Sequence, residues 1–115
     1  MPSATTRIRP VAFLGDSLLR VREFPAEVRR AAGYQLDRVQ RGLDPDDWKP
    51  MQTIGTGVRE IRLRERAGAF RVIYVATLPE AVYVLNAFQK KSQRTPQHHI
   101  ELAADRLREL KRRHS

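Results

Sequence analysis

The chain has 115 residues, of which 41% are hydrophobic and 30% charged, and it contains no cysteine. This length suits one domain, so we expect a single domain over residues 1–115 with its core at about 8–110. The lack of cysteine excludes disulfides and thiolate metal sites, and no apolar run approaches the roughly 20 residues of a membrane span. We therefore expect a cytoplasmic protein with no membrane segment, no cofactor and no metal.

The net charge of +9 is unevenly distributed. Residues 1–57 carry nine Lys and Arg against seven Asp and Glu, whereas residues 58–115 carry thirteen against six. A positive field concentrated on one half of a small chain attracts polyanions. Nucleic acid is the partner class that this pattern favours, and the alternative is a chain that is merely well solvated.

The first part of the chain predicts one strand and two helices. Residues 8–14 are mostly apolar and contain Pro10, which is typical of an edge strand. A short helix is predicted next, which Asp16 or Ser17 caps and which extends through Glu23. From Pro25 onward, apolar residues recur every three or four positions until Gly42, which predicts a longer amphipathic helix. The two helices are expected to form a hairpin against a sheet.

The second part predicts an antiparallel meander and a final helix. Residues 43–57 form a turn-rich connection in which Trp48 is expected to pack against the core. Beyond Thr95, expected as the N-cap, and Pro96, apolar residues again follow helical spacing. Three strands with short turns lie between, at 58–65, 70–78 and 81–89.

The predicted fold class is therefore α+β. An antiparallel sheet, made of the meander and the N-terminal strand, carries the helical hairpin and the C-terminal helix. The order of elements is β-α-α-β-β-β-α, with no internal repeat.

Three segments carry a resemblance to a known family. They are Val84-Leu85-Asn86-Ala87-Phe88-Gln89-Lys90-Lys91-Ser92-Gln93-Arg94-Thr95-Pro96, which Ile100-Glu101 and Ala103 follow, Gly57-Val58-Arg59-Glu60-Ile61-Arg62 and Phe70-Arg71-Val72-Ile73-Tyr74. Together they resemble the phage-derived HigB-like toxins of the RelE/ParE superfamily, which belong to type II toxin–antitoxin systems. The likeness extends over about residues 8–110. It implies a RelE-like fold with helices on one side of the sheet, and a toxin that cleaves mRNA on the ribosome.

The chemistry of RNA cleavage without a metal selects candidate residues. A base must remove the 2′-hydroxyl proton, an acid must protonate the leaving 5′-oxygen, and cations must stabilise the phosphorane. A lysine crowded by other cations loses its proton more readily and becomes a usable base. Our candidates for catalysis are Arg62, Arg71, Lys90 and Lys91. Our candidates for RNA binding are Arg59, Glu60, Arg64, Phe88, Gln93 and Arg94.

Several alternatives stay open from the sequence alone. Arg71 interrupts an apolar strand and needs a partner, which is either Glu60 or a phosphate, and the two are compatible. Phe88 either stacks on a base or fills the core, and Tyr74 and Tyr83 are expected in the core, so the general base is unassigned. A toxin of the resembled kind implies a helix-turn-helix antitoxin in a hetero-oligomer. The other functions are inhibition of DNA gyrase, as in ParE-like members, and a basic module that binds nucleic acid without chemistry.

Overall fold

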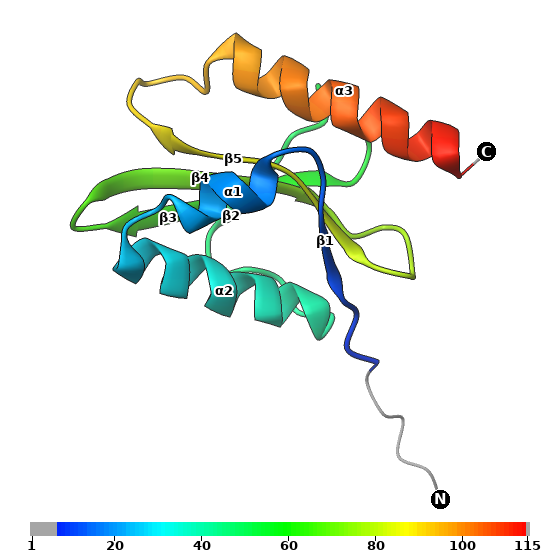
Figure 1. The fold of residues 1–115 in the computed structure, drawn as a ribbon, viewed down its shortest axis with the longest axis horizontal. Helices are drawn as coiled ribbons and strands as arrows, with labels where there is room; N and C mark the ends of the chain where they lie inside the picture. The colour runs from blue at the N-terminus through cyan, green and yellow to red at the C-terminus, as the bar shows by residue number, and fades with distance from the viewer. Residues whose placement is uncertain (1–6, 115) are drawn as a thin grey trace, which may run out of the picture.

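A computed structural model describes residues 7–114, and Figure 1 shows a central sheet with helices on both faces. The elements in chain order are β1 (Val11–Phe13), α1 (Ser17–Arg22), α2 (Ala26–Gln40), β2 (Trp48–Pro50), β3 (Val58–Glu65), β4 (Gly68–Val75), β5 (Val82–Lys90) and α3 (Gln97–Arg113). The α+β class and the order of the predicted elements are confirmed.

The sheet has the strand order β1-β5-β4-β3-β2. The meander β3–β4–β5 is antiparallel, as predicted, and β2 extends it on the outer side of β3. The prediction of a wholly antiparallel sheet was wrong, because β1 pairs with β5 in parallel. The connection over 43–57 also contains β2, which we did not predict. Neither the direction of a three-residue strand nor its existence leaves a clear periodic signal.

The helix α2 covers one face of the sheet. Its apolar stripe, which includes Val28, Ala32 and Leu36, packs on strand residues such as Ile61 and Val72, and all five are buried. This stripe recurs every three or four residues, which is why the segment forms an amphipathic helix on a sheet.

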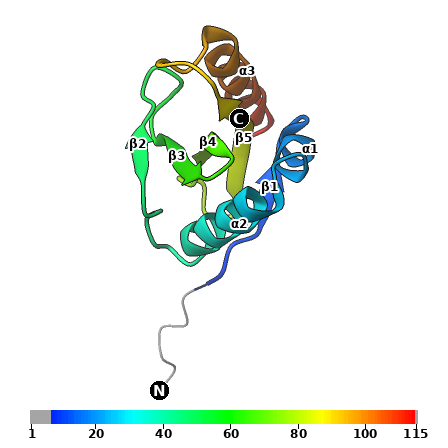
Figure 2. The same cartoon turned by 90° about the vertical axis from the view of Figure 1, so that its left-hand side faces the viewer.

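The helix α3 covers the opposite face, so the expectation of helices on one side only was wrong. Ala103, Leu107 and Leu110 pack against Ile73 and Leu85 in a second buried cluster. Figures 1 and 2 show α2 and α3 separated by the sheet. Because α2 and α3 cover opposite faces of the sheet, alternate residues of β4 and β5 enter two different cores.

A β-bulge in β5 shapes the face that α3 covers. Ile73 pairs with Asn86 and Tyr74 with Val84, which leaves Leu85 as the extra residue on β5. An extra residue lets two successive side chains point to the same face. Leu85 accordingly packs in the α3 core, and Asn86 donates to the backbone carbonyl of His99 on α3 at 3.2 Å.

Two local predictions need correction. Thr95 does not cap α3, since Pro96 is at the N-cap position and no side chain makes a capping hydrogen bond there. Trp48 is half-buried in β2 rather than packed in either core, and the guanidinium of Arg59 lies 3.8 Å from its ring centroid. The hydroxyl of Thr95 and a lysine of β2 both contact Glu60 in the site described next.

Candidate functional site

The sheet face on the α3 side carries the charged residues of β3. Ile61 and Leu63 belong to the core under α2, so Glu60, Arg62 and Arg64 point to the other face. In the register, Arg71 lies opposite Arg62. Four cationic side chains, one from each of four neighbouring strands, are drawn together on this face: Lys49, Arg62, Arg71 and Lys90. We call these four the cationic cluster.

Glu60 lies at the centre of the cationic cluster and is 0% exposed. Its Oε1 is 3.4 Å from Nε of Arg71 and 3.8 Å from Nζ of Lys49. Its Oε2 accepts a hydrogen bond from the hydroxyl of Thr95 at 3.1 Å. A buried carboxylate requires such compensation, because desolvation otherwise costs several kcal/mol. Glu60 is the one buried acid among these four cations, and Asp47 is an exposed acid beside Arg62, so the face keeps a net positive charge.

Two arginines of the cluster have buried donors without a hydrogen bond. Nε of Arg71 and Nε of Arg62 have no partner within hydrogen-bond geometry. Arg71 is 5% exposed and donates from Nη1 to the carbonyl of Phe70 at 3.0 Å. Nε of Arg62 lies 3.6 Å from the Asp47 carboxylate, beyond hydrogen-bond distance. Buried donors are usually satisfied, so these two mark a place where an anion would be bound favourably.

The cluster also changes the proton affinity of its own members. Burial lowers the pKa of Arg71, and the neighbouring Arg62 and Arg64 lower it further, while Glu60 opposes them. The pKa of Lys90 is lowered as well, first by desolvation and then by the charges of Arg71, Lys49 and Arg62, again opposed by Glu60. Nζ of Lys90 donates to the carbonyl of Gln93 at 2.8 Å. Arginine still stays protonated at neutral pH, whereas a lysine in this position comes closer to the range of a proton acceptor.

Arg59 is not part of this face. It pairs with Tyr74, which belongs to the core under α2, and so it points to the opposite side of the sheet. There its guanidinium lies over Trp48 and Nη1 donates to Asp44 at 2.8 Å. The structure therefore separates Arg59 from the other predicted binding residues, and its partners are intramolecular.

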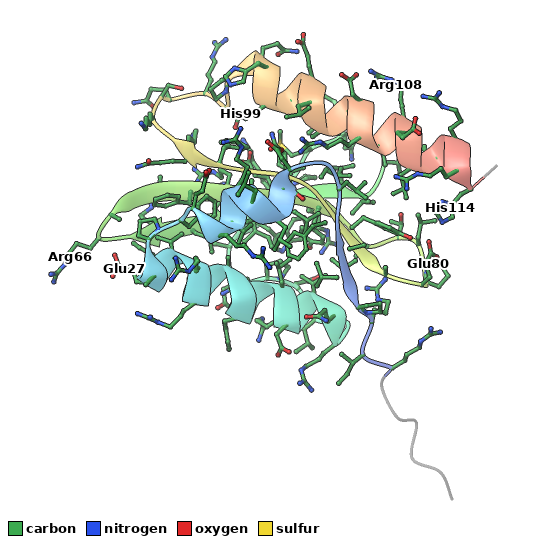
Figure 3. The ribbon with its side chains drawn as sticks, in the orientation of Figure 1. Glu27, Arg66, Glu80, His99, Arg108 and His114 are labelled. Atoms are coloured by element: carbon green, nitrogen blue, oxygen red, sulfur yellow. The ribbon has the colours of Figure 1, made fainter. Side chains whose placement is uncertain are left out.

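Phe88 lies opposite Arg71 in the register but is 5% exposed. Its ring is stacked on the imidazole of His99, with centroids 3.9 Å apart and an interplanar angle of 6°. Figure 3 shows His99 reaching down from the first turn of α3 toward β5. Phe88 is thus core, the alternative that the sequence left open, and it offers no free face to a base in this conformation.

Lys91, Gln93 and Arg94 lie in the exposed segment between β5 and α3. Lys91 borders a groove of about 590 Å³ beside β5, between α1 and the start of α3. The hydroxyl of Ser92 donates a hydrogen bond to the carbonyl of Arg94, and Nζ of Lys90 donates one to the carbonyl of Gln93. Lys90 lies close enough to the other members of the cationic cluster for their charges to lower its pKa, whereas Lys91 borders the neighbouring groove.

Lys49 and Thr95 belong to the site, and the sequence did not indicate either. The sequence suggested that Lys49 lies in a loop. The residues beside it, Trp48 and Pro50, are nevertheless typical of an edge strand. Thr95 looks like a helix cap in the sequence, because Thr followed by Pro is the usual signal for one. Its competing partner, Glu60, is 35 residues away in the chain.

Within residues 7–114, no group of three or more His, Asp and Glu side chains is arranged to hold a metal ion. No helix in the same range is long and apolar enough to cross a membrane. Tyr74 is buried under α2, and the hydroxyl of Tyr83 donates to Glu80 at 2.7 Å, so both tyrosines lie away from the cationic cluster.

The fold and the site together define an α+β protein whose sheet presents a cationic cluster around one buried acid. The family described as Phage derived protein Gp49-like (DUF891) matches residues 20–108, which is more than half of the chain. The chain belongs to this family, which comprises phage-derived toxins related to toxin–antitoxin systems, and such a toxin has a cognate antitoxin. No curated protein matches it.

Proposed function

We propose that this toxin is a HigB-like member of the RelE superfamily and that it cleaves mRNA on the ribosome without a metal ion. The observation that carries the proposal is the cationic cluster, in which four strands supply one cation each around Glu60. The Nε atoms of Arg62 and Arg71, which make no hydrogen bond, add donors of the kind that bind phosphate. The family supports a toxin, and the cluster supports a phosphodiester as its target.

The proposed reaction is attack of the ribose 2′-oxygen on the adjacent phosphorus. The P–O5′ bond breaks, giving a 2′,3′-cyclic phosphate and a 5′-hydroxyl end. Lys90 in its neutral form accepts the 2′-hydroxyl proton, and its lowered pKa favours that form. Arg71 and Arg62 stabilise the charge on the phosphorane, a role that commonly contributes about 3 kcal/mol per donor. The proton for the 5′-oxygen comes from water or from a group that the ribosome supplies.

The remaining candidate residues have supporting roles in this proposal. Arg64 is exposed on the same face as Arg62 and binds a flanking phosphate. Lys91, Gln93 and Arg94 contact RNA from the segment between β5 and α3. Glu60 does not contact RNA, because it is completely buried.

The ribosome supplies orientation that an open sheet face lacks. The cationic cluster lies on the surface of a sheet, and holding a flexible mRNA there for in-line attack costs entropy. An mRNA that the ribosomal A site already holds has lost most of that freedom before the toxin binds, so the entropy cost to the toxin is smaller. We therefore place the protein in the cytoplasm, bound to the ribosome and mRNA, and in a hetero-oligomer with a helix-turn-helix antitoxin when inactive.

The test is induction of the chain without its antitoxin. Primer extension on cellular mRNA is expected to show cuts at fixed codon positions, and purified protein with ribosomes is expected to give the same cuts in excess chelator. Intact transcripts together with trapped gyrase–DNA cleavage complexes would identify a gyrase inhibitor instead. Normal growth with intact transcripts would leave a non-catalytic binding module. A small DNA-binding gene beside the toxin gene is the expected source of the antitoxin.

A further inference from the structure

Glu60 is too deeply buried to touch a substrate. Its side chain is 1% exposed, yet the same carboxylate oxygen faces both Arg71 and Lys49. A buried acid that attracts two cations fixes their positions. Because it is buried, it does not occupy the surface site where the cations bind an anion. Lys49 differs from Arg71 because 44% of its side chain is exposed.

We propose that Glu60 is a positioning residue that holds Arg71 and Lys49 toward one substrate phosphate, and that Lys49 is a phosphate ligand contributed by β2. This inference rests on the proposed function, and it assigns a substrate contact to a strand that the sequence did not predict. The ligand chemistry is a phosphodiester of single-stranded RNA.

The backbone around Lys49 is fixed on both sides of β2. The amide of Arg62 donates to the carbonyl of Asp47 at 2.9 Å, and the amide of Met51 donates to the carbonyl of Val58 at 2.8 Å. Lys49 lies opposite Glu60 in the register between these two bonds. A short strand tied at both ends presents its side chain at a defined position, which a loop lysine does not do.

The carboxylate of Glu60 is itself fixed from the α3 side. Thr95 precedes α3 and donates its hydroxyl to Oε2, which leaves Oε1 for the two cations. Oε1 makes no hydrogen bond, so its interaction with Arg71 and Lys49 is electrostatic rather than directional. This arrangement keeps both cations close and leaves their N–H donors for a phosphate.

The charge of Glu60 also acts on Lys90. The groups that face Lys90 are Lys49 from β2, Arg62 and Glu60 from β3, Arg71 from β4 and the Gln93 carbonyl that precedes α3. Glu60 is the acid among these groups and opposes the lowering of the Lys90 pKa by the cations. Its removal therefore leaves Lys90 among three cations and lowers that pKa further.

The first experiment measures the Lys90 pKa by NMR titration of its Nζ group in the protein without RNA. Glu60→Gln is expected to lower this pKa by about one unit, since it removes a charge near the cluster. Glu65→Gln is the matched control, because Glu65 is on the same strand but points to the other face at its far end. Equal values in wild type and Glu60→Gln would overturn the positioning role.

Thr95→Val gives a second test in which every charge is kept. It removes the hydrogen bond that fixes the Glu60 carboxylate, so the Nε proton of Arg71 is expected to exchange with solvent at least tenfold faster. An unchanged exchange rate would contradict the positioning of Arg71 through Glu60. This variant covers the case in which Glu60→Gln does not fold.

A binding experiment tests the role of Lys49. It uses a single-stranded RNA oligonucleotide with 2′-O-methyl groups, which cannot be cleaved by attack of the 2′-oxygen. Lys49→Ala is expected to weaken binding about tenfold and to reduce the slope of log affinity against log salt by about one. Lys111→Ala, an exposed lysine near the end of α3, is the charge-matched control and is expected to bind like wild type. Equal affinities of the two variants would overturn the assignment of Lys49. Absence of mRNA cleavage by wild type would instead overturn the proposed function and would leave the titration result standing.

Discussion

Nε of Arg71 and Oε1 of Glu60 lie 3.4 Å apart, and the two side chains are 6% and 1% exposed. They come from neighbouring strands but are not register partners, since Glu60 pairs with Ile73 and Arg71 with Arg62. The ion pair therefore crosses the sheet diagonally. Burial makes each charge depend on the other, because a lone charge in this position costs several kcal/mol.

Arg71→Ala is expected to abolish toxicity, and Arg71→Lys is expected not to restore it, because a lysine lacks the two-donor fork that binds phosphate. The alanine variant also leaves Glu60 buried without its nearest cation, so it should lower the free energy of unfolding by about 3 kcal/mol. Growth after induction and a thermal melt of each purified variant measure the two effects.

The double variant Arg71→Ala/Glu60→Gln separates the two roles of Arg71. It removes both buried charges, so most of the lost stability should return while toxicity stays absent. Recovery of toxicity together with stability would mean that Arg71 serves only the fold. Full toxicity of a folded Arg71→Ala variant would contradict the phosphate-binding role directly.

The alternating pattern of β3 allowed much of the site to be predicted. A strand has a period of two residues, so Glu60, Arg62 and Arg64 had to share a face once Ile61 and Leu63 were assigned to the core. Arg71 was recognisable because it interrupts an apolar strand. Both inferences need only local periodicity, which a single sequence contains.

The rest of the site depends on contacts between distant segments. Lys49 enters the cluster through the pairing of β2 with β3, and a three-residue strand has no periodic signal. Phe88 and Arg59 were assigned to RNA binding from their residue types and from their places in the segments that resemble the toxin family. Their actual environments, a stacked His99 and the opposite sheet face, follow from the placement of α3 and from strand register.

Gly33→Ala and Gly15→Ala are expected to change stability in opposite directions. Gly33 lies within α2 with open space where a Cβ would be, so alanine should stabilise the fold by about 0.5–1 kcal/mol. Gly15 has a φ of +57°, and a Cβ there would lie 2.4 Å from Nε of Arg106. Backbone strain of about 1–3 kcal/mol and displacement of Arg106 from Asp16 should destabilise that variant. Denaturant unfolding measures both, and equal midpoints would contradict the described geometry.

The end of α3 should be tethered to the β4–β5 turn in a defined pH window. Nε2 of His114 lies 2.6 Å from the Glu80 carboxylate, and Figure 3 shows the two side chains close together. The pKa of His114 is raised from 6.5, first by the Leu110 carbonyl and then by Glu80, so its contribution is lost as the pH rises through the raised value. The pKa of Glu80 is lowered from 4.5, first by the Tyr83 hydroxyl, so its contribution is lost as the pH falls through the lowered value.

The pair is therefore complete between about pH 4.5 and 6.5. His114→Gln should lower the melting temperature slightly in that window, and the difference should disappear as the pH rises through the raised pKa of His114. A melt series of wild type and variant over pH 4–9 checks this, and Glu80→Gln should reproduce the same dependence. A difference that persists unchanged at high pH would show that the ion pair is not its source.

Lys90 and Lys91 are adjacent in the chain, and we expect them to differ sharply in ribosome-dependent cleavage. Lys90 faces the cationic cluster, where burial and then Arg71 lower its pKa, whereas Lys91 borders the α1–α3 groove. Lys90→Ala should reduce the cleavage rate about 100-fold or more, and Lys91→Ala by less than about threefold. Lys90→Arg keeps the charge but does not release its proton, so it should be as slow as the alanine variant. For wild type the rate should rise with pH up to a midpoint below the usual lysine value of 10.5. A Lys90→Arg variant that cleaves at the wild-type rate with the same pH profile would rule out Lys90 as the base.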